Sequence, residues 1–498
     1  MHSRNLKSES FLNIIKKIFF PINRNEISTF IPVAFLMFCI LFNQNILRIL
    51  KDSIIIAEIS AEVVSFAKIY CVTPAAAIFL IIYSKMVNKF SFEKCYYYLL
   101  TFFISFFLIF AFFIYPNVSS LHLNVDTINS IITSYPNLKW YVILAGNWSY
   151  VLFYVFGELW PNIFYVLLFW QCANSITTTD QAKRFYTLFS LIGNSSVIIV
   201  GLLTMHLASK ESVIKSYFLL WDEKILLTQS LISMVLVSSI VSAFLMKYIA
   251  SNIFIKVDVS EIKDKKPSLG LIESFKYIVS SRYLWLLVIC SSAFGLVMNL
   301  VESVWRSKIK ELYSDVNSYA EFSGMYILWT GVAIIILTVV GNNVMRLYGW
   351  FVAAVITPIV MIISGTIFFT LVVFDKYILG YLDIITIMSP LSLAIIVGAI
   401  QNIVAKGTKY SIWDAATQML YIPLDIELKT KGKAAVDVIS AKSGKSLSAL
   451  IQIALFTIFP AATYNSISPI LMSIFIIVCL AWIYSVKEIG KEYNELIK

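Results

Sequence analysis

Apolar runs long enough to cross a membrane recur along the whole 498-residue chain. A helix needs about 20 apolar residues to cross the hydrocarbon core of a bilayer. Hydrophobic residues make up 59% of the chain and charged residues only 14%, whereas soluble proteins are about 25% charged. The sequence therefore predicts an all-α integral membrane protein. We expect twelve transmembrane helices, at residues 30–50, 63–83, 97–115, 141–170, 187–208, 226–249, 283–304, 324–341, 350–374, 381–404, 434–459 and 467–486.

Lysine and arginine residues are concentrated on one side of the predicted membrane. That side carries both chain ends and the loops at residues 84–95, 250–282 and 405–433, whereas the 116–138 and 460–466 loops contain no Lys or Arg. Because short cytoplasmic loops carry the excess of basic residues, we expect both termini to be cytoplasmic. The net charge of +10 is then explained by membrane topology, and nucleic acid is not an expected partner.

The loop at residues 250–282 divides the predicted spans into two sets of six. The stretch Asn45–Asp52 at the end of the first span resembles Asn299–Arg306 at the end of the seventh, and Gln181–Ser196 resembles Lys431–Ser446. Two parallel six-helix halves around a central cavity form a transporter architecture. We expect an N-terminal segment, an N-terminal half, a linker, a C-terminal half and a tail, at residues 1–29, 30–249, 250–282, 283–486 and 487–498.

Charged residues occur at the end of the first predicted span. Asn45, Arg48 and Asp52 share one helix face, and Lys51 lies beside them. A charged side chain at the bilayer centre costs at least about 2.5 kcal/mol, so such residues usually face a protein interior or a water-filled path. The alternative is that the span ends here and that Arg48 and Lys51 extend to the membrane surface.

Two glutamates stand out in other spans. Glu158 lies well inside the long fourth span, where Pro161 predicts a bend. Glu302 lies near the end of the seventh span, four residues before Arg306. Each glutamate is a candidate for the transport site. The alternatives are a structural ion pair with another span for Glu158 and a local surface pair with Arg306 for Glu302.

The eleventh predicted span carries Asp437, Lys442 and Lys445 in its first half. The triplet Gly444-Lys445-Ser446 suggests a P-loop, but that motif requires a glycine at position 439, which is Ile. Lysines on one face of a membrane helix instead indicate a site for a polyanion. Lys68 in the second span extends this basic lining, whereas Lys183 and Arg184 are more typical of ordinary loop charges.

Charge matching favours a nucleotide as the cargo. A nucleoside triphosphate carries about four negative charges, and several cations on opposing helices can replace the water that it loses. Carboxylates such as those of Glu158 and Glu302 can hold these cations in the empty carrier, or bind the base or ribose. The six cysteines and three histidines are scattered without metal-ligand spacing, so we expect no metal and no cofactor.

Several motifs, in the same order along nearly the whole chain, resemble those of the bacterial and plastid ATP/ADP translocases. They are Arg48-x-x-Lys51-Asp52, Glu158-Leu159-Trp160, Phe169-Trp170-Gln171 through Asn174, Lys183-Arg184-Phe185-Tyr186, Leu300-Val301-Glu302-x-Val304-Trp305, Lys409-Tyr410-Ser411-Ile412-Trp413-Asp414, Tyr421-Ile422-Pro423-Leu424-Asp425, and Lys431-Gly432-Lys433-Ala434-Ala435 followed by Gly444-Lys445-Ser446. The Ile-, Asn-, Lys- and Phe-rich composition is most similar to the versions in rickettsia-like intracellular bacteria.

The resemblance implies a twelve-span carrier related to the major facilitator fold, located in the bacterial inner membrane. It implies exchange of host nucleoside triphosphate for the bacterium's own nucleotide, without hydrolysis, so the protein is expected not to be an enzyme. The family's charged residues important for transport match Lys51, Glu158, Glu302 and Lys445. Secondary candidates for substrate binding are Arg48, Lys68, Asn299, Asp437 and Lys442.

The chain departs from the family pattern at three positions. Thr417 stands where relatives usually have a basic residue, Arg306 replaces a usual lysine, and Lys442 stands where several relatives have arginine or an uncharged residue. Some related carriers resemble transporters of GTP, CTP or UTP. The expected substrates are therefore ATP and ADP or another nucleotide; membrane lipid surrounds the protein, and no obligate protein partner is indicated.

Two other functions are compatible with parts of the sequence. One is a proton-coupled symporter of another organic anion on the same scaffold. The other is a membrane-embedded enzyme, such as a glycosyl or lipid transferase. The second has little support, because the chain has no metal-ligand cluster, no nucleophile with a positioned base and no soluble catalytic domain.

Overall fold

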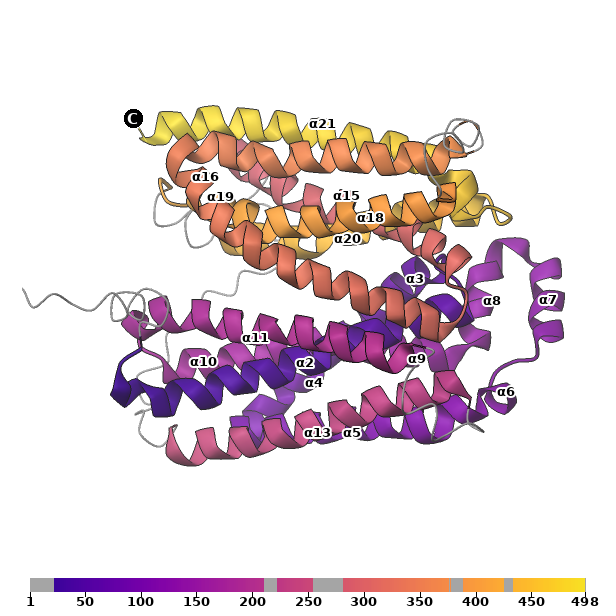
Figure 1. Ribbon diagram of the computed structural model, residues 1–498, viewed down its shortest axis with the longest axis horizontal. Helices are drawn as coiled ribbons and strands as arrows, with labels where there is room; N and C mark the ends of the chain where they lie inside the picture. Colours follow the sequence, from indigo (N-terminus) through magenta and orange to yellow (C-terminus); the bar gives the residue numbers. More distant parts are fainter. Residues whose placement is uncertain are drawn as a thin grey trace, which may run out of the picture.

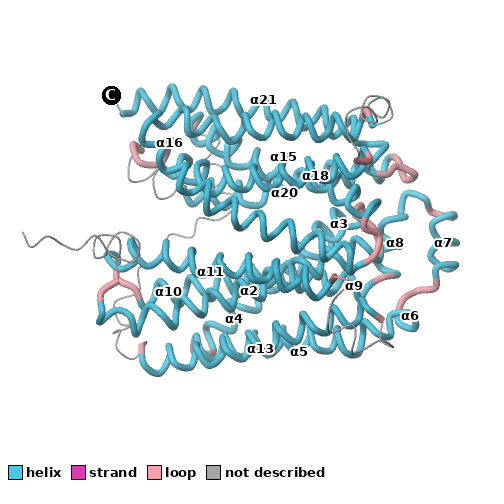
Figure 2. The backbone as a smooth tube through the Cα atoms, in the orientation of Figure 1, coloured by secondary structure: helices cyan, strands magenta, loops and turns pink. Residues whose placement is uncertain are grey.

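The computed structural model describes residues 22–209, 222–253, 281–375, 377, 388–424 and 433–497. All regular elements within these ranges are helices, and Figure 2 shows helix and loop colours only. The prediction of an all-α chain is confirmed. Most of the predicted N-terminal segment and of the 250–282 linker lies outside the described residues.

The helices form two groups that lie side by side (Figure 1). The N-terminal group contains η1 (Arg24–Glu26), α2 (Ile27–Glu58), α3 (Val63–Phe66), η2 (Ala67–Val72), α4 (Thr73–Lys89), α5 (Phe92–Ile109), η3 (Phe110–Ile114), η4 (Tyr115–Asn117), α6 (Val118–Leu121), α7 (Val125–Ser134), η5 (Pro136–Leu138), α8 (Lys139–Gly146), α9 (Trp148–Trp160), η6 (Pro161–Phe169), α10 (Trp170–Ile176), α11 (Thr179–Ala208) and α13 (Glu223–Asn252). The C-terminal group contains α15 (Arg282–Leu312), α16 (Val316–Val373), α18 (Pro390–Thr408), η9 (Lys409–Trp413), α19 (Asp414–Met419), α20 (Lys433–Ile458) and α21 (Tyr464–Ile497).

Eleven helical segments in the described chain are long and apolar enough to cross a membrane. The predicted eleventh span coincides with α20, whose apolar part at Ser443–Ile458 is shorter. The predicted number of twelve transmembrane helices is therefore not confirmed. Spans eight and nine are joined in α16, where Gly349 adopts a φ of 81° that breaks the regular helix and that glycine adopts without a Cβ clash.

The first span extends beyond its predicted end at residue 50, because α2 continues to Glu58, and the fourth and tenth spans also have boundaries other than those predicted. The fourth span begins at Trp148, because the chain turns at Asn147 and residues 139–146 form the separate helix α8. The tenth begins at Pro390, where Ser389 caps the helix, and it continues through η9 and α19 to Met419. Serine at the N-cap followed by proline is a standard helix start. Residues 405–419 are therefore not loop.

Short π-helices interrupt several spans. At Pro161 the fourth span changes from the α-helix α9 to the π-helix η6, because proline lacks the N–H that an α-helix needs. Similar segments, η2 and η9, lie in the second and tenth spans. Such segments are rare and frequently occur at functional sites.

The two helix groups contact each other near the end where α2 and α15 terminate. There Lys310 Nζ donates to the Ile59 carbonyl at 2.5 Å, and the backbone N–H of Tyr464 donates to Glu62 at 3.4 Å. In Figure 1 this is the right-hand end, and the two groups separate toward the left, where α2 begins. We call the right-hand end the closed end and the left-hand end the open end.

Candidate functional site

The charged stretch of the first span lies inside α2, which continues to Glu58. Lys51 is only 5% exposed and Asp52 only 8%. The alternative in which the first span ends at this stretch and Lys51 reaches the membrane surface is therefore wrong. A buried charge is tolerated only with a partner, and each of these two side chains has one.

Lys51 forms ion pairs with two carboxylates. Its Nζ lies 2.8 Å from Asp52 Oδ1 and 2.7 Å from Glu158 Oε1 on α9. The same ammonium lies over the ring of Tyr154, 4.4 Å from its centroid, which adds a cation–π contact. The inter-span ion pair that we considered as the alternative for Glu158 is thus present, and it connects the first and fourth spans.

Asp52 joins the two helix groups. Its second oxygen, Oδ2, accepts a hydrogen bond from the Arg306 guanidinium on α15 at 3.1 Å. Arg306 also lies 3.8 Å from Glu302 one turn earlier on the same helix. The local Glu302–Arg306 pair is therefore present, but it is mostly buried and is not a surface pair.

Glu302 has a closer partner in the tenth span. Its Oε1 lies 2.6 Å from the Nζ of Lys406 on α18, and Lys406 also donates to the Tyr326 hydroxyl at 2.6 Å. The prediction placed Lys406 in a loop, because the predicted tenth span ended at residue 404. The Ser389-Pro390 helix start is the sequence signal that moves this lysine into the span.

Six charged side chains thus form a continuous row across both helix groups. We call them the charged layer; in order they are Glu158, Lys51, Asp52, Arg306, Glu302 and Lys406. In the N-terminal group, a lysine of the first span pairs with a glutamate of the fourth. In the C-terminal group, a glutamate of the seventh span pairs with a lysine of the tenth. The two groups therefore carry the same kind of pair with the charges reversed.

Three further cations lie near this layer without an ion-pair partner among the described residues: Arg48, Lys68 and Lys445. Lys68 in η2 donates to the Asn299 side chain at 3.2 Å, and the Asn299 amide donates to the Lys445 carbonyl at 3.4 Å. Lys445 itself is exposed. Asn299 therefore bonds both to the Lys68 ammonium and to the backbone of Lys445.

Arg48 lines a small polar cavity between α2, α15 and α16. The cavity has a volume of about 30 Å³, and its lining includes Asp52, Glu302, Arg306, Tyr319 and Tyr326. This space holds about one water molecule and is too small for a nucleotide. A central cavity of nucleotide size stays a prediction. With Arg48, Lys68 and Lys445 included, six cations and three carboxylates of the described side chains lie together, an excess of three positive charges among them.

Other candidates lie elsewhere or outside the described side chains. Asp437 and Lys442 belong to α20, and Lys183 to α11, but their side chains are not among those that the structure describes. Arg184 forms a two-bond ion pair with Glu26 at 2.7 and 2.8 Å, as expected of a charge near a span end. The buried Thr417 hydroxyl donates to the Trp413 carbonyl at the end of η9.

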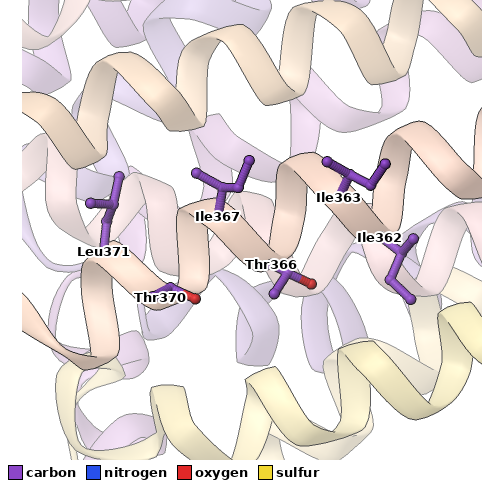
Figure 3. A pocket seen from close by; sticks show the side chains of 6 residues that line it. All are labelled: Ile362, Ile363, Thr366, Ile367, Thr370 and Leu371. Carbon is purple, nitrogen blue, oxygen red and sulfur yellow. The ribbon is translucent and has the colours of Figure 1, made fainter.

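A larger groove, of about 500 Å³, lies on the second half of α16 (Figure 3). Its lining residues are all on one helix and include no charged group: Ile362, Ile363, Thr366, Ile367, Thr370 and Leu371. It is therefore not a site for a polyanion. Among the described residues, no cluster of His, Cys, Asp or Glu could hold a metal ion.

Two helix groups with a row of opposite charges between them form an all-helical membrane fold of the major facilitator type. A solved bacterial homologue of the iron transporter ferroportin, in an inward-facing state, has this fold with a TM-score of 0.58 at 12% identity, covering 93% of this chain and all of that one. The nucleoside transporter NupG is similar with a TM-score of 0.50 at 11% identity, over 91% and 98% of the two chains.

Sequence comparison identifies the family. The model of the TLC ATP/ADP transporter family matches residues 5–493, so the chain belongs to that family and is a transporter, not an enzyme. It is 58% identical to ADP,ATP carrier protein 5 of Rickettsia felis over 98% of this chain and 99% of the relative. It is 41% identical to ADP,ATP carrier protein 3 of Rickettsia prowazekii over 99% of both chains. The predicted family is confirmed.

Proposed function

We propose that this protein exchanges nucleoside triphosphate for another nucleotide across the bacterial inner membrane. Membership of the TLC ATP/ADP transporter family and full-length relatives named ADP,ATP carrier proteins support nucleotide cargo. The observation that carries the proposal within the structure is the excess of three cations beside a buried ion-paired layer. Such an excess attracts a polyanion and balances most of the charge of a nucleoside di- or triphosphate.

The cations that have no ion-pair partner among the described residues are the first contacts for the phosphates in this proposal. Lys445 is exposed, and Asn299 bonds to the Lys68 ammonium and to the backbone carbonyl of Lys445. These two ammonium groups bind the phosphate chain without first breaking an ion pair. Lys51, Glu158 and Glu302 contribute next, because phosphate oxygens replace the carboxylates around the buried cations. Counter-exchange then follows without hydrolysis.

In this proposal, the charged layer also explains why the carrier exchanges nucleotides and does not let one nucleotide pass alone. Opening the closed end requires the Asp52–Arg306 pair to separate, since its members lie on different helix groups. Separating a buried ion pair without replacement costs about 3–5 kcal/mol. A bound nucleotide offsets this cost, because its phosphates give the released cation a new partner. The empty carrier therefore reorients slowly, and cargo on both sides accelerates transport.

The same proposal includes the orientation of the chain. Lys- and Arg-rich loops and both termini lie in the cytoplasm, as the distribution of basic residues indicates. The closed end then faces away from the cytoplasm. Residues 30–249 and 283–486 move as two halves about the charged layer, with 250–282 as their linker, and membrane lipid is the only other partner required.

Uptake of labelled ATP, ADP, GTP, CTP, UTP and NAD into cells or vesicles containing the protein tests this function. We expect uptake of at least one nucleotide, faster when unlabelled nucleotide is loaded inside. A proton ionophore should leave exchange unchanged, whereas it would stop a proton-coupled symporter. If none of these compounds enters although the protein is present in the membrane, the proposed function is wrong. The same panel determines whether the chain, with Thr417 in place of a basic residue, prefers ATP.

A further inference from the structure

Each of the two lysines in the charged layer lies over the ring of a tyrosine. Lys51 Nζ is 4.4 Å from the ring centroid of Tyr154 on α9, and Lys406 Nζ is 5.1 Å from that of Tyr326 on α16. Both tyrosines are buried. An ammonium within about 6 Å of a ring centroid is attracted by the negative face of the ring, and the attraction is stronger away from water. Both lysines therefore have a neutral partner in addition to their carboxylates.

A tyrosine does not compete with a nucleotide for its lysine, whereas a carboxylate does. In the proposed exchange, phosphate oxygens take the places of the carboxylates around Lys51 and Lys406. A long lysine side chain that loses its partner also loses the contact that fixes its rotamer. A ring keeps the ammonium in place and, because it is neutral, leaves the full positive charge to the phosphate.

The N-terminal group holds Lys51 by its stem as well as by its ammonium. A Cβ on Gly157 would lie 2.8 Å from Lys51 Cδ and 3.2 Å from Lys51 Cβ, so the stem packs directly on the α9 backbone at this glycine. Tyr154 lies one turn before Glu158 on the same helix. Within the described chain the Tyr154 hydroxyl makes no hydrogen bond. The ring is therefore the part of Tyr154 that holds the ammonium.

The C-terminal group holds Lys406 by a ring and by a hydroxyl. Lys406 Nζ donates to the Tyr326 hydroxyl at 2.6 Å. The Tyr326 ring makes an edge contact with Trp305, with centroids 4.9 Å apart, and the Trp305 indole N–H donates to the Ile395 carbonyl at 2.9 Å. Tyr326 is thus packed on a side chain that is itself fixed, which is how a binding group is preorganised.

We propose that Tyr154 and Tyr326 are positioning residues, which hold Lys51 and Lys406 in place while nucleotide phosphates displace the carboxylates. This inference rests on the proposed nucleotide exchange and adds two residues that act through the lysines. Loss of either ring weakens binding of every transported nucleotide, because the phosphates are common to all of them. The two tyrosines differ in their hydroxyl, which is required only at Tyr326.

Nucleotide transport by ring and hydroxyl variants tests this assignment, with the nucleotide that the uptake panel identifies as substrate. Tyr154→Leu and Tyr326→Leu should each raise its KM about tenfold or more, as expected for a lost cation–π contact in a buried site. Tyr154→Phe keeps the ring and should recover the affinity that the leucine variant loses. Tyr326→Phe should keep a KM about fivefold above that of the wild type, because Lys406 loses its hydroxyl acceptor.

Fluorinated rings separate electrostatic positioning from packing. Trifluorophenylalanine in place of Tyr154 keeps the ring but weakens its negative face, so the KM should rise toward that of the leucine variant. The same replacement of Phe153, which stacks on Phe110, should leave the KM unchanged. Tyr283→Phe is the matched hydroxyl control, since it removes a buried hydroxyl that donates to the Leu420 carbonyl at 2.6 Å, and it should have the wild-type KM.

The outcomes separate this inference from the proposed function. Uptake by the wild type with unchanged KM in both leucine variants overturns the positioning role but leaves exchange intact. A lower maximal rate at unchanged KM also overturns it, because the tyrosines would then act on helix movement. No nucleotide uptake by the wild type overturns both. If a leucine variant does not reach the membrane, the fluorinated ring at position 154 and Tyr326→Phe decide, and wild-type KM values in these two overturn the inference.

Discussion

Asp52 and Arg306 occupy equivalent positions in the two halves of the sequence and form an ion pair with each other. They are separated by 254 residues, the offset of the internal repeat, and their side chains meet at 3.1 Å. Two equivalent positions can meet only close to the axis that relates the halves. The pair therefore lies near that axis and connects the two helix groups.

Neutralising this pair one residue at a time should be worse than neutralising both. Asp52→Asn leaves Arg306 with only the longer contact to Glu302, and Arg306→Gln leaves Asp52 with Lys51 alone, so each should lower the free energy of unfolding by about 1–3 kcal/mol. The double variant should lose much less than the sum of the two. Thermal unfolding in detergent measures this, with Glu495→Gln at the exposed end of α21 as the control. Additive losses would mean that the two side chains are not energetically coupled.

Lys406 should be essential for transport, although it lies outside the residues that the family resemblance implies. Lys406→Gln leaves Glu302 with only the longer contact to Arg306, so we expect exchange to fall at least tenfold. Lys409→Gln is a close control, because that lysine pairs locally with Asp414 at 2.9 Å. Uptake rates normalised to protein in the membrane give the comparison. Equal rates for the two variants would remove Lys406 from the site.

Replacing either Lys51 or Lys445 by alanine should abolish exchange, but for different reasons. Lys51→Ala leaves the buried Asp52 and the partly exposed Glu158 without this cation and should lower stability as well as transport. Lys445 has no ion-pair partner in the described chain, so Lys445→Gln should keep the stability and raise the nucleotide KM about tenfold or more, as expected for a lost charge-assisted hydrogen bond. Unfolding curves and KM values together distinguish the two roles. Wild-type transport by both alanine variants would exclude them from the site.

Close glycine packing should control closure of the two groups. A Cβ on Gly201 of α11 would lie 2.8 Å from the carbonyl oxygen of Gly324 on α16, and backbone cannot move aside easily. Gly201→Val should therefore separate the groups near the closed end and stop exchange. Labelling of Ser303→Cys by an impermeant maleimide should increase in this background. Gly146→Val, which meets only the flexible tip of Ile128, should label like the wild type.

Much of the fold was predictable because the chain folds in a membrane. A long apolar run such as that before Lys51 satisfies its own backbone hydrogen bonds in lipid when it is helical. The spans are therefore visible in the sequence. The boundaries were less predictable. Ser389-Pro390 and Asn147 decide where the tenth and fourth spans begin, and these local signals are weak beside continuous hydrophobicity.

The sequence by itself also determined that charged residues such as Glu158 and Lys445 lie in spans and need partners, because the cost of an isolated charge in lipid is high. Only the tertiary structure decided which partners they have. Lys51 forms an ion pair with Glu158 and Lys406 forms one with Glu302. Lys445 has no ion-pair partner among the described residues. The reason is physical: an ion pair depends on distances between helices far apart in the chain, and hydrophobic periodicity carries no information about those distances.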